Sequence, residues 1–180
     1  MTNRTILRTT VLATAMMLAS CASTMPAPRY LRQATIPFNA ADAAWSTRPG
    51  KNTISGSALM RTMVGDVKTC AGLLVELIPE TPYARERMAI SFGSGDSGYF
   101  PASNLTAPAP YPEYNRTVRR SVCDAQGTFS FEGLPDGAYF VTASVVWNIP
   151  MRDVALVQGG DLMQRVTVGG GETHKIVLTK

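Results

Sequence analysis

Residue types that carry hydrolytic chemistry are sparse in this chain of 180 residues. His174 is the only histidine and there is no H-E-x-x-H motif, so too few ligands are present for a hydrolytic metal site, and we expect no metal and no cofactor. Glu76 and Glu80 are better explained as solvent-facing charges at the end of a strand than as a catalytic carboxylate pair. P-loop and G-x-G-x-x-G motifs are also missing from the sequence.

One tetrapeptide has the form of a catalytic motif. Gly95-Asp96-Ser97-Gly98 resembles the sequence around the nucleophile of chymotrypsin-like proteases, where a strained backbone presents the serine and forms an oxyanion hole. The match ends at Tyr99, and the general base would have to be His174, which follows the serine instead of preceding it as in that family. A Gly/Ser/Asp loop is the simpler interpretation, so we expect no catalytic residues and no enzyme.

The first 20 residues have the pattern of an export signal. Arg4 and Arg8 supply a basic start, and about ten apolar-leaning residues follow, which is too short for a membrane-spanning helix of about 20 residues. Leu18-Ala19-Ser20-Cys21 ends this segment and resembles the lipobox of bacterial lipoproteins. The resemblance implies that residues 1–20 are a lipoprotein signal peptide and that Cys21 is lipidated through a thioether. An ordinary secretory signal with a chance cysteine is the alternative.

The resemblance also implies a cellular location. Acylation of Cys21 with diacylglycerol and a further chain such as palmitate gives more than one anchor, as stable membrane attachment requires. Ala22 and Ser23 follow the cysteine, and the missing aspartate favours the outer membrane over the inner membrane in enteric-type bacteria. We therefore expect a lipid-anchored protein of the cell envelope.

The net charge of the chain is too small to favour binding of a polyanion such as nucleic acid. The formal net charge of +4 falls to about +2 once the signal peptide and its two arginines are removed. Apart from Arg116, Arg119 and Arg120, the basic residues are spread along the chain. Nucleic acid is therefore not an expected partner.

Cys70 and Cys123 remain after lipidation of Cys21. They form neither a CxxC pair nor a zinc-spaced cluster, and two leftover cysteines in an oxidising compartment most often pair. We expect a disulfide between them, with two free buried thiols as the alternative.

Residues 21–50 are rich in proline and small residues, which is typical of a tether. Within it, residues 39–45 allow a short helix with Asn39 as N-cap. A helix of this length is marginal alone, so it should persist only if Trp45 docks on the domain.

From residue 51 onward, strand and turn signals dominate. Ile54, Ala58 and Met60 alternate with Ser55, Ser57 and Leu59 around Gly56. Residues 73–78 are apolar on both faces, as expected for a strand between two layers. Residues 128–132 alternate, and 138–147 place five apolar residues on one face, namely Tyr139, Val141, Ala143, Val145 and Trp147. Further strands are expected at 162–168 and 173–178. Short strands at this spacing indicate an all-β sandwich.

The run Cys123-Asp-Ala-Gln-Gly-Thr-Phe-Ser-Phe-Glu-Gly-Leu-Pro-Asp-Gly-Ala-Tyr139 resembles the signature of carboxypeptidase-regulatory-like domains, also called transthyretin-like or prealbumin-like. The resemblance spans about 51–180, with residues 54–56 and 73–78 matching the first hairpin of that family. It implies an Ig-like Greek-key sandwich of about seven strands that is non-catalytic. In this signature Asp124 and Gly127 turn a hairpin, Phe129 and Phe131 point into the core, and Pro135 and Gly137 form the next turn.

The chain departs from the family between residues 79 and 118, where an insertion at about 89–115 contains five aromatic residues: Phe92, Tyr99, Phe100, Tyr111 and Tyr114. A loop this long is uncommon in a compact domain and is usually functional or disordered, and disordered segments are poor in aromatics. The rings either cover a sheet edge or the end of the core, or contact a partner.

Two hypotheses for the function remain open. The protein is either a structural or binding module of the envelope that presents loops to a protein or glycan partner, or an accessory scaffold subunit of a secretion or surface-assembly system.

Overall fold

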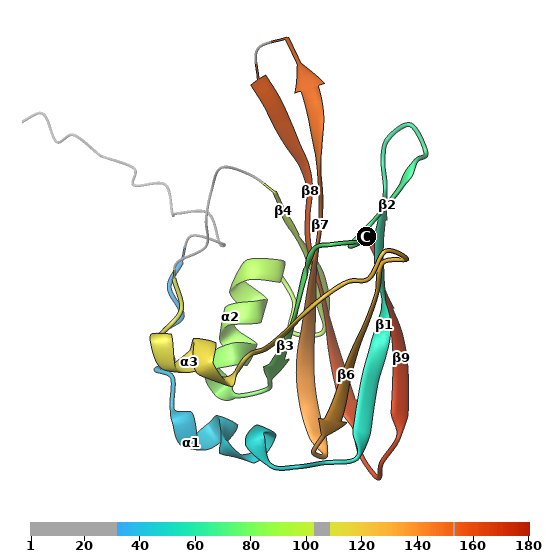
Figure 1. The fold of residues 1–180 in the computed structure, drawn as a ribbon. Coiled ribbons are helices and arrows are strands. Elements are labelled where there is room, and N and C mark those ends of the chain that lie inside the picture. The colour runs from blue at the N-terminus through green and yellow to red at the C-terminus, as the bar shows by residue number, and fades with distance from the viewer. Residues whose placement is uncertain (1–31, 103–108, 153) are drawn as a thin grey trace, which may run out of the picture.

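The computed structural model describes residues 32–102, 109–152 and 154–180. Cys21 and the expected signal peptide lie outside the described residues. Two packed sheets form an all-β sandwich, which confirms the predicted fold class, and helices cover one outer face (Figure 1). The described residues form nine strands instead of the expected seven, and one of them, β4 (Ser97–Pro101), lies inside the segment expected to be an insertion.

Sheet one has four strands built around β1 (Asn52–Arg61). β1 pairs antiparallel with β2 (Val67–Thr69) and with β6 (Thr128–Leu134), and parallel with β9 (Thr173–Leu178). The alternation predicted for residues 128–132 is confirmed, because Phe129 and Phe131 are buried between exposed neighbours.

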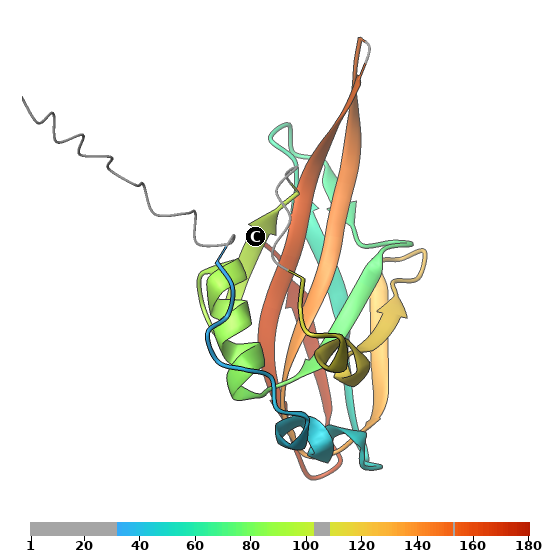
Figure 2. The ribbon, with the colours of Figure 1, turned by 90° about the vertical axis from the view of Figure 1, so that its left-hand side faces the viewer.

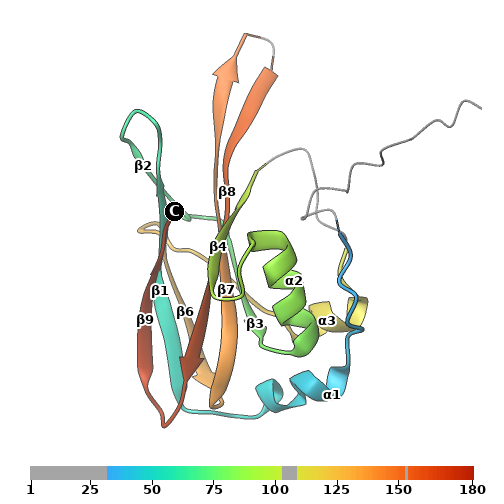
Figure 3. The same cartoon turned by 180° about the vertical axis from the view of Figure 1, so that it is seen from behind.

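Sheet two has five antiparallel strands in the order β4-β8-β7-β3-β5. Their bounds are β3 (Leu74–Pro79), β4 (Ser97–Pro101), β5 (Arg119–Val122), β7 (Gly137–Met151) and β8 (Val154–Val168). The hairpin of β7 and β8 pairs without interruption from Gly137 with Val168 to Met151 with Val154. Its far end projects beyond the sandwich (Figures 1 and 3).

The main core fills the space between the two sheets. From sheet one it takes Ile54, Ala58, Phe129 and Phe131, and from sheet two it takes Val75, Leu77, Tyr139, Val141, Ala143 and Val145. The face predicted for β7 is therefore confirmed. Burial of each large apolar side chain contributes about 1.5–3 kcal/mol, which makes this layer the principal source of stability.

Two pairings implied by the family resemblance are wrong. β1 and β3 do not form a hairpin, because the short β2 takes the place beside β1 and the chain then crosses to sheet two. Asp124 and Gly127 do form a turn, but β5 before it pairs with β3 in sheet two while β6 after it pairs with β1. β3 suits its central position because Val75 and Leu77 face the main core while Ile78 faces the helices.

The expected disulfide between Cys70 and Cys123 is present, with the two Cα atoms 5.7 Å apart. Cys70 follows β2 where the chain leaves sheet one, and Cys123 follows β5 where the chain returns to it. The backbone amide of Cys123 also donates to the carbonyl of Leu73, at 3.0 Å. The bond therefore joins the two crossings between the sheets.

The described residues between 79 and 118 form two helices and a strand instead of the expected long loop. α2 (Pro82–Phe92) begins at Thr81, whose side chain accepts from the Ala84 amide, and ends at Gly93 in the left-handed conformation. α3 (Pro112–Thr117) is the second helix of this region, and β4 lies between the two helices in the sequence. These elements bury a second core against the outer face of sheet two, formed by Ile78, Tyr83, Ala84, Met88, Tyr114, Val118, Phe140 and Met163.

The N-terminal segment packs along the helical layer of α2 and α3 (Figure 2). The predicted short helix is confirmed as α1 (Ala40–Ala43), capped by Asn39 and continued by the 3-10 helix η2 (Ala44–Thr47). Trp45 docks as expected, with its ring centroid 5.1 Å from that of Tyr139. A Cβ at Gly137 would lie 2.3 Å from the Trp45 ring, so this docking requires glycine there. None of the described helices is long and apolar enough to span a bilayer.

Candidate functional site

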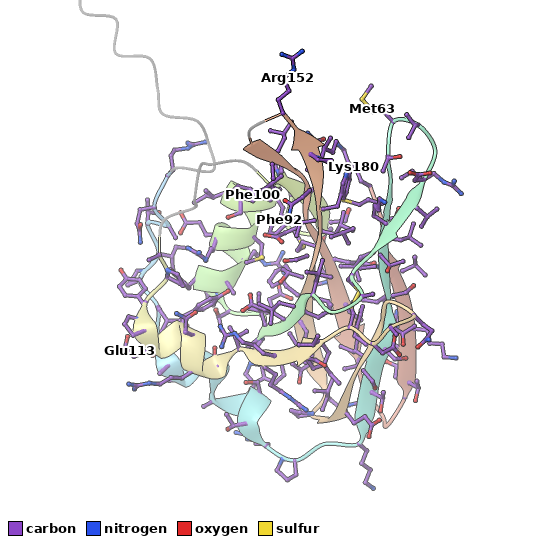
Figure 4. All side chains as sticks on the ribbon, turned by 45° about the horizontal axis from the view of Figure 1, so that its top comes forward. Met63, Phe92, Phe100, Glu113, Arg152 and Lys180 are labelled. Carbon is purple, nitrogen blue, oxygen red and sulfur yellow. A yellow bond between two sulfur atoms is a disulfide. The ribbon has the colours of Figure 1, made fainter. Side chains whose placement is uncertain are left out.

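The five aromatic residues of the predicted contact segment lie in different places. Phe92, Phe100 and Tyr114 line one cavity of about 450 Å³, bounded by α2, α3 and the outer face of sheet two; we call it the outer-face cavity. Figure 4 shows Phe92 and Phe100 near each other at the upper end of α2. Tyr99 and Tyr111 lie elsewhere.

Tyr99 covers an edge of the main core. Its hydroxyl donates to the Gly159 carbonyl at 2.7 Å, and the Lys180 ammonium lies 4.0 Å from its ring centroid. Burial, with a smaller contribution from the negative charge of Asp161, raises the pKa of its hydroxyl. Tyr111 is 41% exposed and its ring lies 5.4 Å from that of Tyr83. Both rings therefore contact other parts of the fold.

The aromatic wall of the outer-face cavity depends on close backbone approach. The rings of Phe92 and Phe100 meet edge to face with centroids 6.3 Å apart. A Cβ at Gly98 would lie 2.5 Å from the Phe92 carbonyl oxygen, so glycine lets β4 pass directly against the end of α2. This contact places Phe100, two residues later in β4, beside Phe92.

Tyr114 lines the same cavity and has a buried hydroxyl. The side chain is only 4% exposed, and its ring packs edge to face on Tyr83 and Phe38. Its hydroxyl makes no hydrogen bond to any described protein atom. Burial raises the pKa of this hydroxyl far above its usual value, and the nearby charges of Arg87 and Glu76 also act on it. The hydroxyl is therefore a neutral donor close to two charged residues that line the cavity.

Polar groups converge on the cavity from several elements. The lining includes Glu76, Arg87, Ser91, Asn115, Thr142 and Asp161. Arg120 donates from Nε to Glu76 at 2.9 Å and from Nη1 to the Asn115 carbonyl at 3.3 Å, which fixes the rim between β3 and α3. Asp161 accepts from the Ser144 hydroxyl at 2.5 Å. The site thus combines aromatic walls with carboxylates, an amide, hydroxyls and a guanidinium.

Glu76 and Glu80 do not act as a pair. Glu76 is part of the cavity rim, whereas Glu80 is an ion-pair centre that attaches α2 to the sheet. Arg165 on β8 donates to Glu80 at 2.7 Å, and Arg85 on α2 also pairs with it. The Glu80 side chain is only 12% exposed, so the prediction of a solvent-facing charge is wrong for this residue. Packing of α2 over the strand end removes it from solvent.

The protease-like tetrapeptide is a turn into an edge strand. Ser97 begins β4 and lies opposite Gln164, while His174 lies in β9 opposite Ile54. The two residues therefore belong to different sheets. Within the described residues no cluster of three or more histidine, cysteine or acidic side chains could hold a metal ion.

Three of the five aromatic residues named from the sequence line this cavity, but the sequence did not predict the cavity or its polar lining. Glu76, Arg87, Thr142 and Asp161 lie far apart in the sequence on β3, α2, β7 and β8. They share no spacing, and only the pairing of the strands and the packing of α2 bring them together. No local signal could have identified them as a group.

Comparison with known proteins identifies a solved structure with a similar fold. No protein-family model matches the chain, and no curated protein sequence matches it. A crystal structure of a candidate carbohydrate-binding protein from Pseudomonas aeruginosa is similar, with a TM-score of 0.68 and 24% sequence identity over 81% of this chain and 99% of that chain. At this level of identity, the similarity establishes a shared all-β fold.

Proposed function

We propose that this protein is a non-catalytic binding module of the bacterial cell envelope that takes a glycan in the outer-face cavity. The observation that carries the proposal is the convergence of Phe92, Phe100 and Tyr114 with charged and amide groups in one cavity of about 450 Å³. A largely apolar cavity with a few convergent polar groups is the usual form of a ligand site.

The chemistry of the lining favours a sugar over a purely apolar ligand. A sugar ring has an apolar C–H face that can pack on an aromatic ring and hydroxyl groups that need both donors and acceptors. Phe92 and Phe100 supply the apolar surface, while Asp161 and Arg87 supply an acceptor and donors. The similar fold of the candidate carbohydrate-binding protein from Pseudomonas aeruginosa supports the same ligand class.

The cellular location is a second part of the proposal. The lipobox at Leu18-Ala19-Ser20-Cys21 supports a lipid anchor on Cys21 and attachment to the outer membrane. The disulfide between Cys70 and Cys123 is consistent with an oxidising envelope compartment. A relationship to carboxypeptidase-regulatory-like domains is supported by the Asp124 turn and by buried Phe129 and Phe131.

The test is glycan binding by the purified mature chain, first on an array of envelope-derived and host oligosaccharides and then by calorimetry. Phe100→Ala removes part of the aromatic wall, so binding should weaken about tenfold. Tyr114→Phe keeps the packed ring and removes only a buried hydroxyl, so binding should be unchanged, and the melting temperature of this variant should stay the same or rise because the hydroxyl has no described partner.

Two carboxylate-to-amide variants, one inside the cavity and one outside it, provide a matched comparison. Asp161→Asn removes a charge inside the cavity, and Glu113→Gln makes the same kind of change on the exposed side of α3, where Figure 4 shows Glu113 pointing away from the molecule. Glycan binding should fall with Asp161→Asn and persist with Glu113→Gln. Unchanged affinities for both Asp161→Asn and Phe100→Ala would rule out this cavity as the glycan site.

A further inference from the structure

Two hairpins project from the same end of the sandwich. The turn between β1 and β2 forms one tip at residues 61–67, and the far end of β7 and β8 forms the other, which we define as residues 148–152 and 154–157. Together we call them the hairpin tips. Figures 1 and 3 show both at the end opposite η2, and Figure 4 shows Met63 and Arg152 at their apices. They lie apart from the outer-face cavity.

The hairpin tips carry most of the exposed apolar surface. Of the eleven large apolar side chains that are exposed in the described chain, six lie here: Met63, Val64, Val67, Ile149, Leu156 and Val157. Met63 is fully exposed and Val64 is 86% exposed. Soluble proteins rarely gather apolar side chains in this way unless the surface meets a partner or a membrane.

The distribution of these side chains favours a bilayer over a protein groove. Ile149 and Leu156 face each other across the β7–β8 hairpin and share one face, whereas Val157 lies opposite Asn148 on the other face. A groove would cover one face, but here both faces and the apex of the neighbouring hairpin are apolar. Surfaces of this form suit insertion of the whole tip into the apolar boundary of a membrane.

The charges around the hairpin tips indicate an insertion that is mainly apolar. Arg61, Lys68 and Arg152 are nearly balanced in the sequence by Asp66 and Asp153. Attraction to anionic lipid should therefore be weak, and binding should depend little on salt. The uninterrupted pairing of β7 with β8 satisfies the backbone groups between those two strands close to the apex.

We infer that the hairpin tips insert shallowly, at the boundary of headgroups and acyl chains, into the bilayer that holds the proposed lipid anchor. The chain from Cys21 to the first described residue, Arg32, can span at most about 40 Å, so the anchor keeps the domain close to the membrane surface. At that effective concentration a weak second contact is sufficient to orient the domain. The inference rests on the proposed anchor for this local concentration and is independent of glycan binding.

The test uses the mature chain from Ala22, which lacks the lipidated cysteine and contains every described residue. Flotation with vesicles of phosphatidylethanolamine and phosphatidylglycerol measures partitioning directly. Serine at Met63, Val64, Ile149 and Leu156 should reduce partitioning at least about tenfold, because each lost apolar side chain removes part of the driving force.

The matched control places serine at Val122 and Val177, which are 59% and 58% exposed and lie outside the hairpin tips. This control should bind vesicles like the parent chain, and both variants should keep the parental melting temperature. Three results would overturn the inference: no partitioning by the parent chain at about millimolar lipid, the effective concentration that a short tether supplies, equal loss in the control, or a dimer in light scattering that the tip variant abolishes without any vesicle binding. Loss of partitioning in high salt would contradict the apolar mode of insertion.

Discussion

Replacing both Cys70 and Cys123 with alanine is expected to lower the free energy of unfolding by about 4 kcal/mol. The bond joins the two segments that cross between the sheets and closes the loop between them. Without the bond, the unfolded chain gains conformational entropy, which lowers the stability of the native state. The native fold should survive, because the main core is formed by the strands on either side.

The magnitude follows from the length of the closed loop. The two cysteines are 53 residues apart, and the chain-entropy relation assigns a loop of this size about 4 kcal/mol at 25 °C. Cys70 and Cys123 are both buried, so alanine also removes packing volume. Reduced parent protein separates the two effects, because reduction opens the loop and leaves both side chains in place.

The assay is equilibrium unfolding in urea of the parent, the reduced parent and the double variant. With a slope of about 2 kcal/mol per M, the midpoint should fall by roughly 2 M on reduction. A midpoint shift of less than about 0.5 M, with the bond shown to be fully oxidised before reduction, would refute the prediction that closing this loop stabilises the fold by about 4 kcal/mol.

Trp45→Ala should lower the free energy of unfolding by about 2 kcal/mol, measured by urea unfolding, because the ring packs on Tyr139 and is only partly buried. Hydrogen bonds from the Thr128 side chain and backbone hold the pKa of Asp124 below its usual range, so its contribution to stability is present above about pH 4 and is lost as pH falls through the lowered pKa. Asp124→Asn should remove this part of the acid dependence, and unfolding midpoints from pH 5 to pH 2 that run parallel in the two proteins would contradict it. Cys21→Ser should leave the protein precursor-sized or soluble in cell fractionation, and a variant that still pellets with membranes through carbonate washing would disprove lipid anchoring.

Local signals were sufficient for several elements. Alternation in residues 128–132 and 138–147 predicted β6 and β7 with the correct buried faces, because one face of each strand must meet the core. Asn39 was recognised as an N-cap since its side chain meets the first free amides of a helix. The disulfide was predicted from the count and expected compartment of the cysteines alone.

α2 was missed although its end signals are present in the sequence. Thr81 and Pro82 begin the helix and Gly93 ends it. Tyr83, Ala84 and Met88 are buried on one side of the helix, but the apolar residues Ala89 and Ile90 lie outside this buried set, so the sequence shows little amphipathic periodicity. The helix is instead held by the Glu80 ion pairs and by the second core.

By itself, the sequence determined the sandwich class, the strand faces, the disulfide and the short capped helix, because alternation, caps and cysteine pairing are read from neighbouring residues or from composition. Tertiary structure alone decided that β3 joins β7 instead of β1, and that Asp161 and Glu76 line a cavity with Phe92. These outcomes depend on contacts between residues that are distant in the chain. The alternation within a strand specifies which face is buried, but it does not specify which strand is the partner.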